Sequence, residues 1–460
     1  MKALLFRSFV LLLFTGQIVN AQSPLCFNSY TPADVASEPM SLTSADFNED
    51  GKIDIAVADR NDDKISILLG NNNGSFAAAT NYPVGSIPFY ITTADFNGDG
   101  HLDLATANSG TNTISVLLGM GNGMFGAATS YTVDIGPYFI ISSDFNNDGS
   151  IDLATGNFFA GTISVLVGNN TGIYASAVTY SVESGARSLT VADFNSDGHK
   201  DIVVTNQMSN SISILTGNGV GLFSLFGNIA TEADPIAITS SDFDHDGKMD
   251  LAIANLGSNN ISVYSGTGSG TFATQVNYSV GTEPHSITTG DFNGDGETDL
   301  AVCNWHSNNI SVLVGSVSGT FAAAVNYSVN SEPVSLISND FNADGKADLA
   351  IVNLLSDNVS VLLNCNTVGV NEYHSLFEDV SVFPSPTHGD HINFNINSKS
   401  DKTIVITITD NLGQTVIDNH QIIRTGGNEI KLDLGNLSNG FYYLNVVNGE
   451  TVRNIKFVKN

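Results

Sequence analysis

The sequence predicts an all-β protein, a seven-bladed β-propeller followed by a small β-sandwich. Three observations predict the propeller. The motif DFNxDGxxD, with Asp for Asn in the fifth copy, recurs seven times at intervals of 49 residues without insertion or deletion. Each interval holds four short apolar runs separated by Gly, Asn and Asp turns, and no helical periodicity is visible. Seven four-stranded units close into a propeller, which leaves only short sheet edges.

The first interval shows one unit clearly. Pro39 precedes the first run, and an acidic loop separates the first run from the second. The four runs are 42–46, 55–58, 65–69 and 76–84. An open solenoid is the alternative architecture, but it needs atypical capping units at its ends.

The two ends of the repeat region predict how the ring closes. The seventh unit stops at Cys365 without a fourth run, whereas Phe27 lies 49 residues before Phe76, in the phase of a fourth run. We therefore expect the N-terminal segment to complete the last blade. In this register Cys26 and Cys365 face each other across a hairpin turn, which predicts a disulfide in place of the missing link. Cys303 falls where other units have Ala58, Ala107 and Gly156, so we expect it to be buried.

The chain ends predict export. Residues 1–21 combine Lys2 and Arg7 with a short apolar stretch and an acceptable cleavage site at Ala21, as in a secretory signal peptide. No other long apolar segment is present, so no membrane span is expected. The predicted organisation is a signal peptide over 1–21, the propeller over 22–366, a linker over 367–378 and a C-terminal domain over 379–460.

Charge is concentrated in the repeats. The formal net charge is −30, and residues 22–366 hold 36 acids against 7 bases. Such an acidic domain argues against nucleic acid and anionic membranes as partners. Because 22 of those acids are loop aspartates, the charge indicates cation binding more than the choice of partner.

The repeated acidic loop predicts calcium binding. Positions 1, 3, 5 and 9 carry oxygen donors, position 7 offers its backbone carbonyl, and a glycine at position 6 permits a sharp turn. The loop is not an EF-hand, because position 12 is apolar and no helix flanks it. The predicted metal-binding residues are Asp46, Asn48, Asp50, Lys52, Asp54; Asp95, Asn97, Asp99, His101, Asp103; Asp144, Asn146, Asp148, Ser150, Asp152; Asp193, Asn195, Asp197, His199, Asp201; Asp242, Asp244, Asp246, Lys248, Asp250; Asp291, Asn293, Asp295, Glu297, Asp299; and Asp340, Asn342, Asp344, Lys346, Asp348.

We expect up to seven structural Ca²⁺ ions. The fifth loop has an additional carboxylate, Asp244, and should bind most tightly. With no bidentate Glu, the sites should have modest affinity, suited to extracellular calcium. The alternative for any single loop is an ordinary Asx-rich turn without an ion.

These residues resemble the FG-GAP/VCBS repeats of integrin-α-type propellers. The resemblance rests on the acidic loops and on the segments that begin at Phe76, Phe125 and Phe321, and it covers about residues 26–365. It implies that the loop joins the first two strands of each blade and binds Ca²⁺. Asn at position 3 in six of seven loops implies lower affinity. Fungal seven-bladed lectins and some polysaccharide lyases look similar in repeat type, so glycans are candidate ligands.

The C-terminal region resembles the type A C-terminal sorting domain of the type IX secretion system. The matching residues are 382–389, 410–413, 437–442 and the basic end 456–459. The resemblance implies the secretion machinery as a partner, export through the outer membrane, and a cell-surface or extracellular location. Independently, alternating runs at 404–409, 430–434 and 441–447 predict a small Ig-like sandwich. A generic accessory sandwich is the alternative.

Positions that differ between blades are the candidates for ligand specificity. On the face opposite the acidic loops, one set follows each proline: Met40, Phe89, Tyr138, Arg187, Ile236, His285 and Val334. A second set joins strands two and three: Arg60, Ser109, Phe158, Gln207, Leu256, Trp305 and Leu354. Two aromatic clusters result: Phe89, Tyr90, Tyr138, Phe139 and Phe158, and His285, Trp305 and His306.

The predicted ligand-binding residues are Phe89, Tyr138, Phe158, His285, Trp305 and His306, in a binding or adhesion module for a glycan or protein. The alternative is that these side chains plug the central channel or pad its rim. No catalytic residue is predicted, because the sequence lacks a G-x-S-x-G elbow, an H-E-x-x-H motif and a Cys/His nucleophile pair. A polysaccharide lyase or glycosidase using the same face is the competing function.

Overall fold

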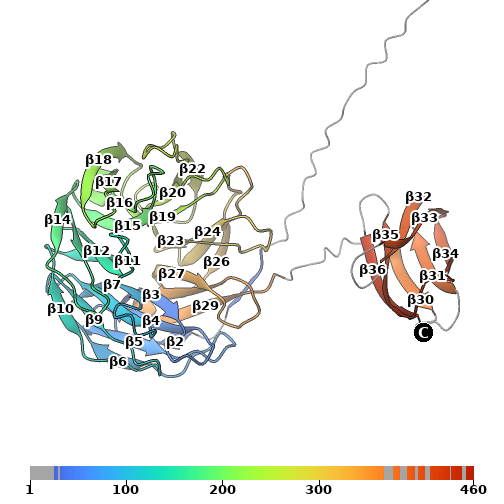
Figure 1. Cartoon of the computed structure of the whole chain (residues 1–460), viewed down its shortest axis with the longest axis horizontal. Helices are drawn as coiled ribbons and strands as arrows, with labels where there is room; N and C mark the ends of the chain where they lie inside the picture. Colours follow the sequence, from blue (N-terminus) through green and yellow to red (C-terminus); the bar gives the residue numbers. More distant parts are fainter. Residues whose placement is uncertain are drawn as a thin grey trace, which may run out of the picture. The chain divides into compact units, whose positions relative to one another are not determined.

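The computed structural model describes residues 25–29, 32–366, 377–383, 391–398, 402–409, 415–435, 437–447 and 452–459. The chain divides into two compact units, residues 1–368 and 369–460. The first unit contains seven antiparallel sheets, and their first strands surround one axis (Figure 1). The predicted seven-bladed propeller is therefore confirmed.

In every blade the first strand lies nearest the axis and the fourth strand lies outermost. Blades one to four are β3 (Pro39–Ala45), β4 (Asp54–Asp59), β5 (Lys64–Leu68), β6 (Thr80–Pro83); β7 (Pro88–Ala94), β8 (Asp103–Asn108), β9 (Thr113–Leu117), β10 (Thr129–Thr132); β11 (Pro137–Ser143), β12 (Asp152–Asn157), β13 (Thr162–Leu166), β14 (Val178–Ser181); and β15 (Ala186–Ala192), β16 (Asp201–Asn206), β17 (Ser211–Gly217), β18 (Phe223–Ala230). Blades five to seven are β19 (Pro235–Ser241), β20 (Asp250–Asn255), β21 (Asn260–Tyr264), β22 (Val276–Ser279); β23 (Pro284–Gly290), β24 (Asp299–Asn304), β25 (Asn309–Leu313), β26 (Val325–Ser328); and β27 (Pro333–Asn339), β28 (Asp348–Asn353), β29 (Asn358–Asn364), β1 (Phe27–Ser29). Short 3-10 turns lie at Gln207–Ser209 and Leu354–Ser356.

The second strand of every blade is buried along its whole length, as in β4 and β8. Its residues pack between neighbouring blades, so both faces of the strand lie in apolar cores. This explains why the second run reads as continuously apolar rather than alternating. The cores are therefore inter-blade layers, and ring closure is required to bury them all.

The fourth strand is shorter than predicted in blade one. Regular pairing begins at Thr80, whereas Phe76 makes only an isolated bridge with Gly70. The ring of Phe76 instead packs edge-on against Phe341 of the neighbouring blade, 6.2 Å between centroids. This aromatic side chain packs between two blades, and the regular hydrogen-bonded ladder of the fourth strand does not extend to it. Blade four is the exception, because β18 is continuous over eight residues.

The closing blade is assembled from both ends of the repeat region. Strand β1 pairs with β29, Phe27 lies opposite Asn364, and β2 (Ala33–Asp34) extends the same edge. A disulfide joins Cys26 to Cys365, with 5.1 Å between their Cα atoms. The predicted closure and disulfide are therefore confirmed. Cys303 is buried and free, as expected.

Two asparagines also compensate for the interrupted turn. In blade two the turn glycine Gly123 donates its N–H to the carbonyl of Phe47 in the preceding blade. At the closure the equivalent carbonyl, that of Phe292, accepts hydrogen bonds from the side-chain amides of Asn364 and Asn366. At the interrupted hairpin, side-chain amides thus replace the backbone N–H as donors of this inter-blade hydrogen bond.

The second unit contains two antiparallel sheets. One has the order β30 (Phe377–Phe383), β31 (His391–Ser398), β34 (Gly426–Asp433); the other has the order β33 (Thr415–Ile423), β32 (Lys402–Thr409), β35 (Gly440–Val447), β36 (Val452–Lys459). Phe394 from the first sheet and Ile406 and Phe457 from the second share one buried core. The predicted sandwich is confirmed. Residues 384–389 and 410–413 of its predicted motifs, and the predicted signal peptide, lie outside the described residues.

Candidate functional site

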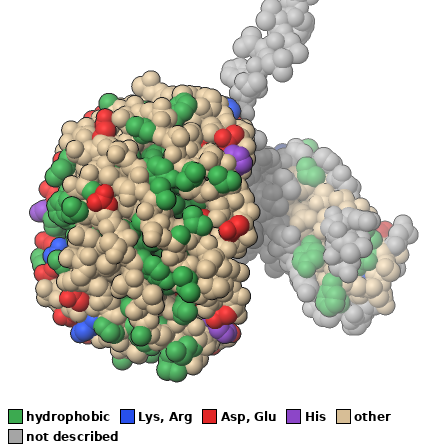
Figure 2. All heavy atoms as spheres, turned by 60° about the vertical axis from the view of Figure 1, so that its left-hand side comes forward, with side chains coloured by type: hydrophobic (Ala, Val, Ile, Leu, Met, Phe, Trp, Pro, Cys, Tyr) green, Lys and Arg blue, Asp and Glu red, His purple; other side chains and the backbone are tan. Residues whose placement is uncertain are grey.

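The strand order separates two faces of the propeller. The acidic loops connect the first and second strands at one end of each blade, here called the loop face. The connections between strands two and three, and those between blades, lie at the other end, here called the opposite face. Acidic side chains are dispersed over the surface seen in Figure 2, where few basic side chains are visible.

Each acidic loop is held in shape by its own aspartates. In the first loop Asp46 accepts the N–H of Asp50 at 3.0 Å and the N–H of Gly51 at 2.7 Å. Gly51 has φ of +81°, a conformation that other residues rarely adopt. Asn48 accepts the N–H of Asp50 as well. The predicted turn at position 6 is therefore present, and the oxygens of positions 1 and 3 are oriented by backbone donors.

The aspartate at position 9 has a structural function that the sequence did not reveal. Asp54 is buried and accepts the N–H of Phe47 at 3.0 Å and that of Gly70 at 2.7 Å. It thereby ties the loop to the turn after the third strand. Burial raises its pKa to about 6. The same pair of backbone hydrogen bonds recurs at Asp103, Asp152, Asp201, Asp250, Asp299 and Asp348.

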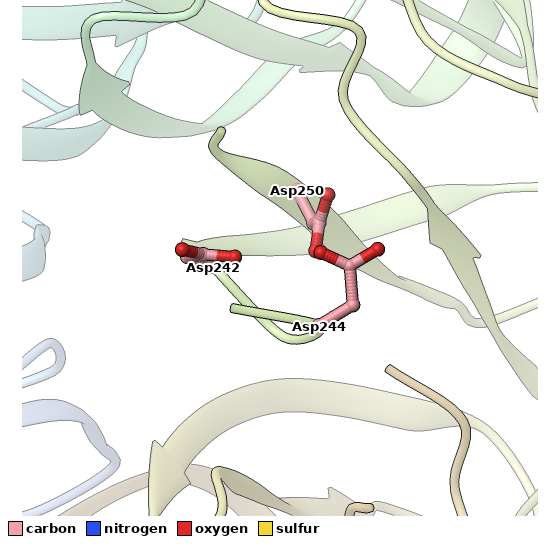
Figure 3. Close-up of side chains that lie close together, drawn as sticks. All are labelled: Asp242, Asp244 and Asp250. Atoms are coloured by element: carbon pink, nitrogen blue, oxygen red, sulfur yellow. The ribbon is translucent and has the colours of Figure 1, made fainter. Parts of the chain in front are cut away.

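The fifth loop brings three carboxylates together. One oxygen from each of Asp242, Asp244 and Asp250 lies within 4.8 Å of the others, and the side chains converge in Figure 3. In the second loop position 3 is Asn97, whose amide donates to Asp99 at 2.9 Å. An asparagine there contributes no negative charge, so the fifth loop has one carboxylate more than the second loop.

Side chains at position 7 point to other partners. Lys52 binds Asp50 of its own loop at 2.7 Å. His101 contacts Glu49 of the preceding loop, and Glu297 contacts His245 of its preceding loop at 2.8 Å. The two His–Glu contacts link neighbouring loops, and in these three loops the backbone carbonyl is the candidate ligand at position 7.

A small pocket lies on the axis at the opposite face. It has a volume of about 70 Å³ and is lined by residues of all seven first strands. The whole first variable set contributes to it: Met40, Phe89, Tyr138, Arg187, Ile236, His285 and Val334. Met40, Ile236 and Val334 are buried, whereas the other four are half-buried. These side chains therefore fill the mouth of the channel rather than an outer rim.

The first predicted aromatic cluster forms as a set of ring contacts. Phe89 and Tyr138 stack with centroids 4.0 Å apart, and Tyr138 stacks on Phe158 at 4.8 Å. Tyr90 and Phe139 lie 4.0 Å apart deeper in the pocket. The stacked rings of two adjacent blades cover much of one another's apolar surface. This is expected if the side chains plug the central channel.

Arg187 joins the two predicted aromatic clusters into one arrangement. Its guanidinium carbon lies 5.0 Å from the centroid of Tyr138, and its Nη2 donates to Nε2 of His285 at 3.4 Å. The imidazole of His285 donates from Nδ1 to the carbonyl of Val334 at 2.6 Å and contacts Trp305 at 5.9 Å. Burial and the charge of Arg187 lower the pKa of His285 to about 3. Arg187 of blade four thus contacts both blade three and blade six.

His306 lies outside this arrangement. Its side chain is exposed and forms an ion pair with Glu283. Of the six predicted ligand-binding residues, Phe89, Tyr138, Phe158 and His285 surround Arg187, and Trp305 is adjacent to them. We name Phe89, Tyr138, Phe158, Arg187 and His285 the channel cluster.

Sequence comparison identifies the repeats. A model of the FG-GAP-like repeat matches residues 46–106, 144–204, 193–253, 242–302 and 291–351, and an FG-GAP repeat model matches residues 91–128. The chain belongs to the FG-GAP repeat family. The FG-GAP propeller is followed by a match to the secretion system C-terminal sorting domain over residues 381–460. This domain assigns the protein to type IX secretion, with export to the cell surface or extracellular space.

Solved structures that resemble the FG-GAP propeller share its fold at low sequence identity. A structure of BBS1N in complex with ARL6DN aligns with a TM-score of 0.56 at 14% identity, over 75% of this chain and 98% of that chain. The periplasmic gluconolactonase PpgL of Pseudomonas aeruginosa aligns with a TM-score of 0.50 at 18% identity, over 64% of this chain and 86% of that chain. The sequence matches no curated protein at a significant level. In the described part of the chain, no helix has the length and apolar character needed to cross a membrane.

Proposed function

We propose that the exported FG-GAP propeller is a calcium-stabilised binding module whose opposite face takes a glycan or protein ligand. The observation that carries the proposal is the aromatic and arginine side chains gathered at the mouth of the axial pocket. Aromatic residues and Arg are enriched where proteins bind ligands, because they offer large apolar area with polar groups at the edge. Phe159, Ile135 and Met208 extend this surface, at 62%, 56% and 64% exposure.

Calcium would act on the loop face. In each loop the aspartates of positions 1, 5 and 9, the Asn or Asp of position 3 and the carbonyl of position 7 are the oxygen donors that suit Ca²⁺. The convergence of Asp242, Asp244 and Asp250 supports this assignment for the fifth loop. Bound cations would neutralise carboxylates that otherwise repel one another, so the role is structural.

Removal of calcium tests the structural role. A site occupied at a hundred times its Kd adds about 2.7 kcal/mol to the free energy of unfolding. We expect EDTA to lower the Tm of the full chain and excess Ca²⁺ to restore it, as followed by circular dichroism. Mg²⁺ at equal concentration should restore less, since it prefers a smaller, more regular oxygen shell. An unchanged Tm would reject the proposal.

A pair of matched variants tests the binding face. Phe159→Ala removes a 62%-exposed ring on the opposite face, and Ile173→Ala removes a 60%-exposed side chain in a turn on the loop face. Neither should change folding. On glycan and matrix-protein arrays we expect Phe159→Ala to weaken the signal by about tenfold or more, as for an interface hot spot, and Ile173→Ala to leave it unchanged. Equal signals for both variants would argue against this face.

A further inference from the structure

Residues 22–366 contain two arginines, Arg60 and Arg187, and both lie against the ring of Phe89. Arg60 forms an ion pair with Glu38. Among the residues that the structure describes, no carboxylate lies within ion-pair distance of Arg187. Arg187 is therefore a cation whose counter-charge the described protein does not supply.

The surroundings of Arg187 only partly compensate its charge. The guanidinium carbon lies 5.8, 5.0 and 5.9 Å from the ring centroids of Phe89, Tyr138 and Phe158. Cation–π contacts contribute about 0.5–2 kcal/mol each, and buried charges in proteins are ordinarily paired. Burial lowers the pKa of Arg187 to about 10, so it stays charged at neutral pH. Its single described hydrogen bond, to His285, leaves most of its five N–H donors for another acceptor.

The pocket beside Arg187 fits a small anionic group. Its volume of about 70 Å³ corresponds to roughly two water molecules, which is enough for a carboxylate and too little for a sugar ring. Ser188 and Ser286 line the same pocket and can donate hydroxyl hydrogen bonds. His285 is neutral, so Arg187 is the cation that an anion would meet.

Acidic side chains are spread around the opposite face. The residue before the first strand is Glu38, Asp234, Glu283 or Glu332 in blades one, five, six and seven. In blades two, three and four it is Ile87, Gly136 or Gly185. Backbone hydrogen bonds from Phe158 to Gly136 and from Trp305 to Glu283 place these residues beside the connections of the opposite face. Asp134 and Glu183 lie two residues before Gly136 and Gly185, so the connections into blades three and four also carry an acidic side chain.

We propose that Arg187 binds the carboxylate of a uronate-bearing glycan, with the sugar ring outside the pocket and against the exposed aromatic surface. This inference rests on the proposed binding function and names its ligand class. A glycan with few uronates is favoured over an acidic peptide by these acidic side chains. Carboxylates there only accept hydrogen bonds, sugar hydroxyls can donate to them, and a carboxylate-rich peptide would be repelled.

Trp305 provides a direct readout, because it is the sole tryptophan of the chain and its ring contacts His285, the hydrogen-bond partner of Arg187. The full chain is titrated with sodium D-galacturonate, with D-galactose and with sodium acetate at constant ionic strength, and Trp305 emission is recorded. We expect saturable changes with galacturonate and acetate and none with galactose. A neutral oligosaccharide that ends in one uronate should bind more tightly than a blocked tri-aspartate peptide.

Three variants assign the effect. Arg187→Gln should weaken galacturonate binding at least tenfold, Arg187→Lys should retain part of it, and Arg60→Gln, at the neighbouring paired arginine, should stay within twofold of the wild type. Melting curves identify any variant that fails to fold, and Arg187→Lys, which keeps the charge, then carries the comparison with Arg60→Gln.

Two results would overturn the inference: no response to either carboxylate, or equal responses in the wild type and Arg187→Gln. Tighter, Arg187-dependent binding of the peptide would overturn the glycan assignment. If Phe159→Ala abolishes array binding while Arg187→Gln does not, the inference fails and the proposed function stands. If neither variant affects array binding, both fail.

Discussion

Asp59 occupies a blade position at which the other six blades carry asparagine: Asn108, Asn157, Asn206, Asn255, Asn304 and Asn353. In blade two the amide of Asn108 donates to Ser115 at 2.9 Å. A charged Asp59 cannot donate; it accepts from Ser66 at 2.6 Å, and its second oxygen is buried without a partner among the described residues. Burial therefore raises the pKa of Asp59 to about 7.

Asp59→Asn should stabilise the propeller at pH 8 and change little at pH 4. The folded protein holds the Asp59 proton more tightly than the unfolded chain, so the free energy of unfolding falls as pH rises from about 4 to about 7. Asp62 and Asp357 raise this pKa further, and Lys64 opposes them. We expect a gain of about 1–3 kcal/mol at pH 8, measured as Tm across the pH range.

The reverse change in the next blade is the control for Asp59. Asn108→Asp introduces the same buried carboxyl group and should lower the Tm at pH 8 more than at pH 4. A pH-independent effect of Asp59→Asn would contradict the assignment of the buried charge to Asp59.

At the scale of the element, the acidic loop has the same residue at position 9 in all seven blades, whereas the candidate metal-binding residue at position 3 differs. Position 9 holds every loop in the same way through two backbone N–H groups, as Asp250 does with Phe243 and Gly266. Position 3 differs, because Asp244 stands alone against six asparagines. The scaffold sets the shape of the loop, and position 3 sets the charge available to a cation.

Exchanging the residue at position 3 should change the Ca²⁺ affinity of the loop that carries it. Asp244→Asn removes a carboxylate from the fifth loop, and Asn97→Asp adds one to the second. Because affinity in oxygen-ligand sites follows the number of charged ligands, we expect a change on the order of tenfold in Kd for one site in each direction. Calorimetric titration of EDTA-treated protein with Ca²⁺ measures it. Identical titrations for the two variants and the wild type would contradict the role of position 3.

At the scale of the whole molecule, closure depends on a chain segment far removed in sequence. The disulfide joins residues separated by 339 positions, and β1 completes the blade whose other three strands come from the end of the repeats. Without closure, blades six and seven would lose the packing of Phe27 against Phe292 and Tyr327. The ring is therefore stabilised at the point where it would open first.

The double variant Cys26→Ser/Cys365→Ser should lower the Tm. The chain-entropy model gives an upper estimate of about 5–6 kcal/mol for a loop of this length. Reductant should lower the Tm of the wild type to that of the double variant and leave the double variant unchanged. Cys303→Ala, which removes the buried free thiol and keeps the disulfide, is the control, and reductant should lower its Tm as it does that of the wild type. Equal melting of oxidised and reduced wild type would refute the closing role.

Part of the site could be found in the sequence and part could not. The loops were recognisable because their donors lie within nine consecutive residues, and Cys26 and Cys365 because the 49-residue phase places them. The anchoring function of Asp54 was hidden, since its partner Gly70 belongs to a turn 16 residues later. Phe76 was expected to start a strand, but its ring packs between blades instead.

The sequence by itself determined the number of blades, the positions of the acidic loops, the closing disulfide and the C-terminal sandwich, because a strict period carries register from one unit to the next. Only the tertiary structure decided that Arg187 and His285, 98 residues apart, meet on the axis. That contact joins blades four and six across the ring, and no local pattern encodes a distance that depends on seven blades closing. The placement of the charged Arg187 among aromatic side chains therefore depends on closure of the ring.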